Sequence, residues 1–294
     1  EKIFCKMKVD FFIVGAPKSG TTSLFHYLNR HPQVVMSSQK EPNYFSYDAI
    51  HDKGMYYDNN NINTLNKYES LFLQKENVLY GEASVSYLFY DNVAEKIKKY
   101  NPNSKIIIML RNPIERAFSH YLMDYRLGLI SDSFENIITK KSKHKNAHLY
   151  YQQYIEVSKY AKQIQRYLDF FEKDNILFID FEDFKKNISF AVGNVYSFLN
   201  ISTSFNIDKH IKHNVFTMPK NNLIRFIYSF TFFRKIITFL FPIFLIKYIR
   251  KIFFNLDKKP ELSNDTIRKL NKIFNNDVIK LEELLSKDYS KWIK

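Results

Sequence analysis

The sequence predicts an α/β fold, with one domain spanning residues 1–294 and a central parallel sheet flanked by helices. Short apolar runs with the composition of buried strands occur at 11–14, 106–110 and 176–179. Segments with helical periodicity lie between these runs, and strands that alternate with helices are typical of a parallel sheet. The chain contains no internal repeat and no linker that would divide it.

A short loop and then a helix are expected after the first of these runs. The run Phe11–Val14 ends at Gly15, and a loop follows it. Residues 21–30 then place apolar side chains at helical spacing. The pattern stops before Pro32, which disfavours helix in the residue that precedes it. This order predicts a strand, a tight loop and a helix.

The remaining elements follow from similar patterns. The run at 106–110 is typical of a central parallel strand, and the helix after it is expected to begin at Pro113 with Asn112 as its cap. A third strand is expected at 176–179. Over 263–285 apolar residues recur at helical spacing, which predicts a closing helix capped by the serine at its start.

The composition excludes several classes of protein. Charged residues make up 25% and hydrophobic residues 45% of the chain, which are globular values and exclude a largely disordered protein. The single cysteine, Cys5, excludes an internal disulfide and a multi-cysteine zinc site, and it favours a reducing, cytoplasmic compartment. We expect no secretory signal, and the longest uncharged apolar run, 236–246, is too short to span a bilayer.

The loop between the first strand and helix has the features of a phosphate-binding site. Its sequence, GAPKSGTT at 15–22, places glycines, a lysine and paired threonines at a helix N-terminus. Backbone N–H groups and the helix dipole bind anions at such a position. The residues expected to contact phosphate are Lys18, Ser19, Gly20, Thr21 and Thr22.

The loop departs from the Walker A pattern, in which Gly-Lys-Ser/Thr follows the first glycine after four residues. Here Lys18 precedes Gly20 instead of following it. No clear strand-end aspartate is available to hold Mg²⁺. Asp180 is the nearest candidate, and residues 181–184 after it are expected to form a polar exit loop. We therefore expect no metal site, and a metal-dependent kinase or ATPase is the weaker interpretation.

Two segments resemble the cofactor motifs of sulfotransferases that use 3′-phosphoadenosine 5′-phosphosulfate (PAPS). The lysine followed by Ser-Gly-Thr-Thr at 18–22 is similar to the family's 5′-phosphosulfate loop, and RNPIERAFSHY at 111–121 is similar to its 3′-phosphate segment. Arginine forks two hydrogen bonds to one phosphate, so Arg111 and Ser119 are the expected 3′-phosphate ligands. Weaker resemblances to the bacterial and heparan-sulfate branch of the family lie at 39–45, 80–88 and 281–292.

The resemblance implies transfer of a sulfuryl group from PAPS to an acceptor hydroxyl or amine, without a metal. Lys18 matches the lysine that steadies the leaving phosphate, and Glu41 matches the catalytic glutamate of the heparan-sulfate members. Lys220 matches a basic residue in a loop that closes over the cofactor. Asn43 replaces a histidine of many relatives, and an alanine replaces the lysine after Glu82. Glu82 is therefore either a second base or a structural residue.

The positive charge is concentrated in one segment. The chain carries 44 basic and 30 acidic residues, a formal net charge of +14. Residues 209–259 hold eleven basic residues, one acidic residue and many aromatics. Three interpretations stay open: a helical segment that packs on the core, a basic amphipathic surface on an anionic membrane, or the wall of a glycan-binding cleft. Nucleic-acid binding is not favoured, because no recognition motif is present.

The sulfotransferase hypothesis is the preferred one. The acceptor that the resemblance implies is a carbohydrate hydroxyl in a polysaccharide or glycolipid. Two alternatives stay open: a nucleotide-dependent kinase on a P-loop-like fold, and a basic membrane- or polyanion-binding protein without enzymatic activity. The joint presence of both cofactor motifs favours the enzyme.

Overall fold

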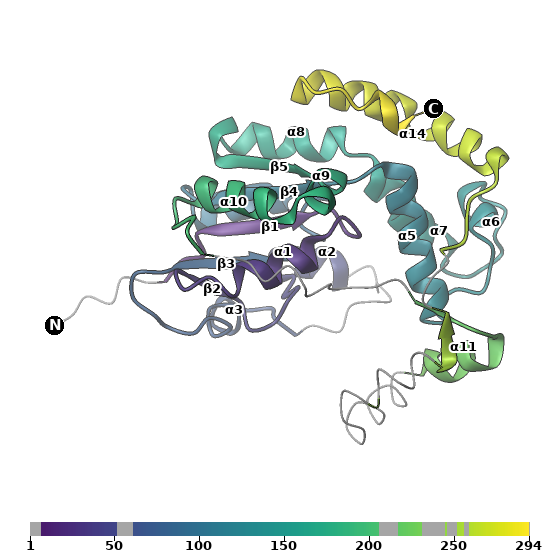
Figure 1. Ribbon diagram of the computed structural model, residues 1–294, viewed down its shortest axis with the longest axis horizontal. Helices are drawn as coiled ribbons and strands as arrows, with labels where there is room; N and C mark the ends of the chain where they lie inside the picture. Colours follow the sequence, from purple (N-terminus) through teal and green to yellow (C-terminus); the bar gives the residue numbers. More distant parts are fainter. Residues whose placement is uncertain are drawn as a thin grey trace. The chain divides into compact units, whose positions relative to one another are not determined.

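The computed structural model describes residues 7–51, 61–205, 217–230, 245, 252–255 and 259–293. Within them, five strands form one parallel sheet in the order β2-β3-β1-β4-β5 (Figure 1). The strands are β1 (Phe11–Gly15), β2 (Val34–Met36), β3 (Leu79–Ala83), β4 (Lys105–Leu110) and β5 (Ile176–Asp180). The predicted α/β fold, with a central parallel sheet flanked by helices, is confirmed.

Helices connect the strands and follow them. They are α1 (Thr21–Leu28), α2 (Tyr47–His51), α3 (Leu65–Glu69), α4 (Val93–Tyr100), α5 (Pro113–Arg126), α6 (Phe134–Ile138), α7 (Ala147–Tyr154), α8 (Ala161–Phe170), α9 (Phe181–Lys186), α10 (Ile188–Leu199), α11 (Asn222–Ser229) and α14 (Asn264–Leu285). Two short strands, β6 (Met218–Pro219) and β7 (Phe254–Asn255), pair in antiparallel orientation on either side of α11 in the sequence.

The chain groups into two compact units. The first comprises residues 1–113, 159–212 and 276–294, and the second comprises 114–158 and 213–275. The parallel sheet belongs to the first unit, and the pair β6–β7 with α11 belongs to the second. The single domain over 1–294 stays a prediction.

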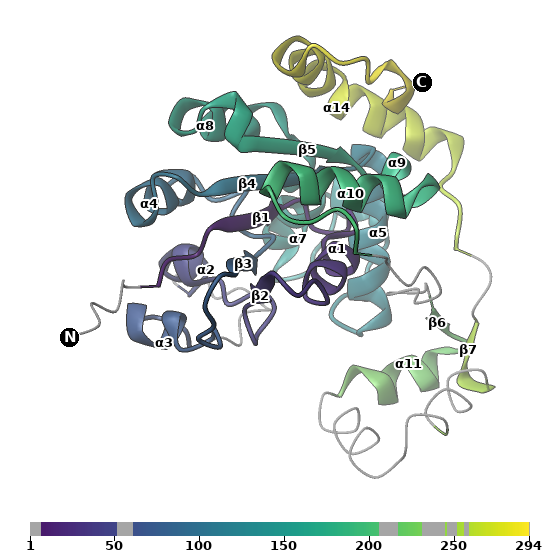
Figure 2. The ribbon, with the colours of Figure 1, turned by 60° about the vertical axis from the view of Figure 1, so that its left-hand side comes forward.

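One face of the sheet in the first unit is covered by α1 and α10 (Figure 2). Side chains alternate between the two faces of a strand, so Phe11 and Ile13 of β1 point to this face together with Ile107 and Met109 of β4. All four are fully buried. The intervening Phe12 is buried on the other face, where its ring meets that of Phe45 at 5.8 Å between centroids. Burial on both faces explains why β1 and β4 are continuous apolar runs.

The order of the strands brings three loops to one edge of the sheet. In the register, Ile13 of β1 pairs with Ala83 of β3 on one side and with Ile107 of β4 on the other. Because these strands are parallel, the segments that follow them begin at the same edge, where α/β folds bind ligands. The phosphate loop, Ser84 and Arg111 all start there.

The predicted elements agree with the structure in most places. The strands at β1, β4 and β5 are confirmed to within one residue, and α5 begins at Pro113 as predicted. The closing helix is α14, and Ser263 caps it by accepting a hydrogen bond from the N–H of Thr266 at 3.1 Å. The strands β2 and β3 were not predicted.

The polar exit loop predicted for residues 181–184 is wrong. These residues begin helix α9, directly after β5. The residue that precedes the helix, Asp180, has extended backbone angles, and Glu182 and Asp183 lie in the first turn, where negative charge stabilises a helix through its dipole. Phe184 is buried beneath them.

Most of the basic aromatic segment predicted at 209–259 lies outside the described residues. The parts that are described are 217–230, 245, 252–255 and 259. Within the described portion of the chain, no helix combines the length and apolar character needed to cross a membrane.

A buried arginine organises the core of the second unit. Arg116 of α5 is fully buried, and its Nη2 donates to the carbonyls of Gln153 at 2.5 Å and Tyr154 at 2.9 Å. Its Nε donates to Oγ of Ser158 at 2.5 Å. A buried charge is tolerated when hydrogen bonds satisfy its donors.

Candidate cofactor and catalytic site

The loop between β1 and α1 forms a cradle at the N-terminus of α1. Lys18 and Gly20 have positive φ, of 69° and 92°. A Cβ on Gly20 would lie 2.9 Å from Cδ2 of Phe181, so both the backbone angle and the space require glycine here. First-turn N–H groups have no partner within a helix, so those of Thr21 and Thr22 suit an anion.

Ser19 gives independent support for a ligand in this cradle. The residue is fully buried, and its Oγ has no hydrogen-bond partner among the described residues. A buried hydroxyl without a partner costs about 1–3 kcal/mol. A phosphate oxygen would supply the partner, so the residues present fit a cofactor that carries phosphate.

Arg111 joins the phosphate loop from the end of β4. Its Nη1 donates to the carbonyl of Lys18 at 3.1 Å, although the two residues are 93 positions apart. The guanidinium lies over the ring of Phe181, 4.7 Å from the centroid. The hydroxyl of Tyr160 donates to the carbonyl of Arg111 at 2.9 Å. The first residue of the second motif therefore contacts the phosphate loop.

Two of these residues are not identifiable from the sequence pattern. Phe181 is the first residue after β5, and β5 neighbours β4, so the strand order alone places it at the edge where Arg111 lies. The strand order is a property of the tertiary structure and is not visible in the local sequence. Tyr160 is one of 21 tyrosines, and no local signal distinguishes it.

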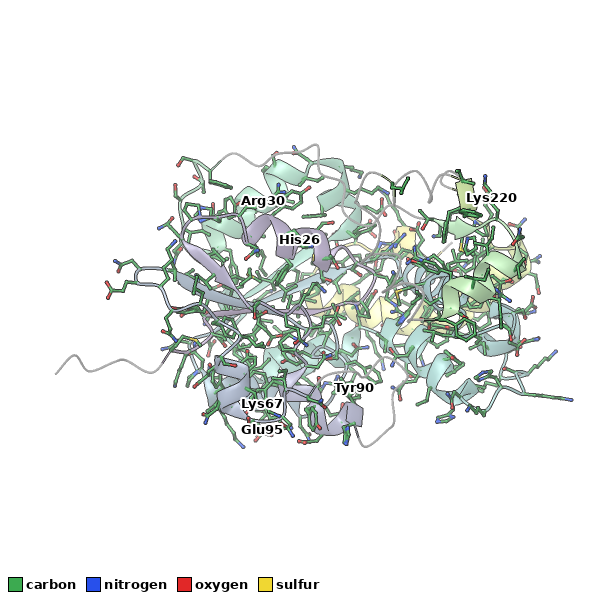
Figure 3. All side chains as sticks on the ribbon, turned by 90° about the horizontal axis from the view of Figure 1, so that it is seen from below. His26, Arg30, Lys67, Tyr90, Glu95 and Lys220 are labelled. Carbon is green, nitrogen blue, oxygen red and sulfur yellow. The ribbon has the colours of Figure 1, made fainter. Side chains whose placement is uncertain are left out.

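Ser119 and Lys220 belong to the second unit. Ser119 is half-buried on α5, the helix that begins directly after Arg111-Asn112. Lys220, labelled in Figure 3, follows β6 and is exposed, and its N–H donates to the carbonyl of Phe253 at 3.0 Å. Their roles as ligands of the cofactor stay predictions.

Glu41 lies on a loop that is fastened to the end of β3. Its N–H donates to the carbonyl of Ala83 at 3.0 Å, and the N–H of Asn43 donates to Oγ of Ser84 at 3.0 Å. Both Glu41 and Asn43 have positive φ, of 63° and 54°, conformations that cost energy and often occur at functional loops. The Glu41 side chain is 38% exposed, and its Oε1 accepts a hydrogen bond from Nζ of Lys40 at 2.8 Å. It is therefore open to an acceptor while held in place.

Glu82, which the sequence left as a second base or a structural residue, is fully buried. Its Oε2 accepts a hydrogen bond from the hydroxyl of Tyr68 at 3.0 Å. The ring of Tyr68 stacks on that of Tyr44, with 4.7 Å between centroids and 15° between planes. The burial favours the structural role, because Glu82 holds the tyrosine on which the loop after Glu41 packs.

The buried carboxyl of Glu82 makes the stability of the protein depend on pH. Burial raises its pKa from the ordinary value of 4.5 to about 7, against opposing hydrogen bonds from Ser84, Tyr68 and Tyr87. Between pH 4.5 and about 7 the folded chain keeps a proton that the unfolded chain has lost. Stability therefore falls as the pH rises through this window, by a total of about 3 kcal/mol.

Glu82→Gln is expected to remove this pH dependence, because the amide is uncharged at every pH. The free energy of unfolding of the variant, measured against that of the parent at the same pH, should therefore be higher at pH 8 than at pH 5. Urea unfolding of both proteins at the two pH values measures the effect. The exposed Glu76→Gln is the control and should follow the parent. An equal pH dependence in Glu82→Gln and the parent would contradict the assignment.

Asp180, the nearest candidate for a Mg²⁺ ligand, is engaged by the C-terminal segment. Its carboxylate pairs with Nζ of Lys287 and accepts a hydrogen bond from the hydroxyl of Tyr289 at 3.2 Å. Over the described residues, no group of three or more His, Cys, Asp or Glu side chains is placed to hold a metal ion. Independence from a metal stays a prediction.

A parallel α/β sheet with a loop of this kind after its first strand defines a P-loop-like fold class. The model of the sulfotransferase domain family matches residues 8–283, and the chain belongs to this family. The resemblance that the two cofactor motifs carry is confirmed.

Individual relatives agree with this membership. Carbohydrate sulfotransferase 15 of Homo sapiens is 27% identical over 243 residues, which cover 65% of this chain and 43% of that protein. Heparan sulfate glucosamine 3-O-sulfotransferase 6 of Mus musculus is 26% identical over 212 residues, which cover 69% of this chain and 55% of that protein. The crystal structure of a sulfotransferase from Alicyclobacillus acidocaldarius is similar with a TM-score of 0.72 and 28% identity, over 98% of this chain and 100% of that one. The chain spans less than half the length of the first curated relatives it matches.

Proposed function

We propose that the chain transfers a sulfuryl group from PAPS to an acceptor hydroxyl or amine. The observation that carries this proposal is the hydrogen bond from Arg111 to the carbonyl of Lys18, which joins the 5′-phosphosulfate loop to the 3′-phosphate segment. A site for a nucleotide with phosphate at both ends requires these two groups together. Membership of the sulfotransferase family supports the same activity.

PAPS supplies an activated sulfuryl group on a phosphate leaving group. In the proposed site, the 5′ end is held by Lys18, Ser19, Gly20, Thr21 and Thr22, and the 3′-phosphate by Arg111 and Ser119, with Lys220 as a further ligand. The Lys18 ammonium neutralises negative charge at the leaving phosphate, as preorganised cations do in related transfer reactions. The fixed loop holds this cation in position before the reaction begins.

Glu41 is the proposed general base. Its carboxylate is half exposed at the edge of the sheet, and its ion pair with Lys40 orients it. It accepts the proton that the acceptor hydroxyl loses as its oxygen attacks sulfur. Glu82 is fully buried and has no access to an acceptor in this arrangement.

The proposed acceptor is a carbohydrate hydroxyl, in a polysaccharide or glycolipid. The names of the relatives, a carbohydrate and a heparan sulfate sulfotransferase, support this class. A cytoplasmic location and a peripheral contact with an anionic membrane are part of the proposal, and such a contact would bring the enzyme to glycolipid acceptors.

A transfer assay tests the proposal. The protein is incubated with [³⁵S]PAPS, a chelator, and a panel of polysaccharides, glycolipids and simple hydroxyl or amine acceptors, and labelled product is measured. Labelled product on at least one acceptor is expected. The kinase alternative replaces the proposal if no acceptor is labelled while phosphate is transferred from ATP in the presence of Mg²⁺.

A further inference from the structure

Helix α11 of the second unit carries apolar side chains on its outer face. Leu223, Phe226 and Ile227 of the helix, and Phe230 directly after its last residue, recur at the spacing of one helix face. Their side chains are between 45% and 67% exposed. The rings of Phe226 and Phe230 meet edge to face, 5.1 Å between centroids, so they form one continuous patch.

The opposite face of α11 is held against the rest of the second unit. The guanidinium of Arg225 lies over the ring of Tyr125, 4.1 Å from its centroid. The ring of Tyr228 meets that of Phe254 in β7 at 5.0 Å between centroids. These contacts orient the helix with a basic and a polar aromatic residue inward. The outward direction of the apolar face is therefore fixed by specific packing.

Two further exposed apolar residues lie in the segment that pairs with the one before α11. Ile252 and Phe253 are 46% and 43% exposed and precede β7. The N–H of Lys220, just before α11, donates to the carbonyl of Phe253, next to the paired strands β6 and β7 (Figure 2). Across the described part of the chain, six of the ten large apolar side chains that are exposed lie in these two segments. The apolar surface considered below comprises Leu223, Phe226, Ile227 and Phe230.

The charge of the surrounding sequence selects the occupant of this surface. Residues 209–259 hold eleven basic residues and one acidic residue. A second copy of the chain would bring the same positive charge, and the two would repel each other. An anionic lipid surface offers apolar chains for the exposed rings and negative headgroups that match the net positive charge of this stretch of sequence.

We propose that this apolar surface inserts into the headgroup region of an anionic lipid bilayer. The inference gives the proposed membrane contact its site, and it rests on that contact and not on the transfer chemistry. Both attractive terms act together, so binding requires anionic lipid and weakens with salt.

The test is co-sedimentation of the whole chain with vesicles of phosphatidylglycerol and phosphatidylcholine, and with vesicles of phosphatidylcholine alone. The parent protein is expected to bind the mixed vesicles at low salt and to bind the neutral vesicles weakly. The double variant Phe226→Ser/Phe230→Ser is expected to lose binding by at least about tenfold, because two rings no longer enter the bilayer. The matched control is Phe190→Ser/Leu73→Ser, whose side chains are 66% and 76% exposed in the first unit, and it should bind like the parent.

Three results would overturn the inference. In the first, the parent protein does not bind anionic vesicles at low salt. In the second, the variant at 226 and 230 binds as tightly as the control. In the third, sedimentation velocity finds that the parent and the control are dimers and that the variant at 226 and 230 is a monomer, while the vesicle binding of this variant is unchanged. The occupant of the surface would then be a second copy of the chain. Circular dichroism and binding of adenosine 3′,5′-bisphosphate show whether each variant is folded. Binding of this nucleotide also tests the sulfotransferase proposal separately, so loss of vesicle binding with intact nucleotide binding concerns the apolar surface alone.

Discussion

Lys18→Ala is expected to abolish most of the transfer activity and to weaken binding of adenosine 3′,5′-bisphosphate. The substitution removes the ammonium that is proposed to contact the leaving phosphate, but it leaves the Lys18 carbonyl, which accepts the hydrogen bond from Arg111. The loop therefore keeps its connection to Arg111 and loses one charged group. Loss of one stabilising group of this kind lowers kcat by about 10²–10³, and loss of one charge-assisted contact weakens binding by about tenfold or more.

Two measurements check this expectation: single-turnover transfer from PAPS, and calorimetric titration with adenosine 3′,5′-bisphosphate. Lys162→Ala removes an exposed lysine from α8 and serves as the control, with both values expected to match the parent. If Lys18→Ala kept the parent rate with saturating PAPS, the leaving group would be stabilised by another residue.

Glu41→Gln is expected to keep cofactor binding and lose transfer. The amide has nearly the shape of the carboxylate but accepts no proton, so only the step that needs a base is affected. A positioned general base contributes about 10²–10⁴ in rate, and kcat should fall by that factor. Because Glu41 lies on a loop bound to the end of β3 and is not one of the proposed phosphate ligands, the dissociation constant of adenosine 3′,5′-bisphosphate should change by less than about twofold.

The matched control for this substitution is Glu76→Gln, an exposed glutamate whose loss should leave kcat unchanged. Steady-state kinetics with saturating PAPS and varied acceptor give kcat and KM separately. Turnover equal to that of the parent rules Glu41 out as the base. A rise in KM with unchanged kcat would instead assign Glu41 to binding of the acceptor.

Local sequence carries much of the fold because the central strands are buried on both faces. β1 and β4 are apolar throughout, and this pattern is visible in the sequence. β3 is different: its sequence is LYGEA, and it was not predicted. Its Gly81 is needed because a Cβ there would lie 2.1 Å from the ring of Phe11, and its Glu82 is buried through a hydrogen bond from Tyr68. Both residues are explained by tertiary contacts, so the local composition of β3 does not identify it as a strand.

The candidate site divides in a similar way. The phosphate loop could be predicted because its glycines, lysine and threonines are adjacent in the sequence and lie at a helix N-terminus. Arg111 was assigned from a second motif, and only the strand order accounts for its contact with the loop. Phe181 was missed because its place beneath the guanidinium depends on β5 lying beside β4. The exit loop predicted there was wrong because its acidic residues stabilise the first turn of α9.

The most direct measurement is isothermal titration calorimetry of the whole chain with adenosine 3′,5′-bisphosphate in the presence of a chelator. The cradle after β1, joined to Arg111, predicts saturable binding of this nucleotide at one site without Mg²⁺. It also predicts that ATP with Mg²⁺ binds more weakly, because ATP lacks the 3′-phosphate that Arg111 is proposed to hold. Absence of binding by adenosine 3′,5′-bisphosphate, together with binding of ATP and Mg²⁺, would contradict the assignment of this site to PAPS.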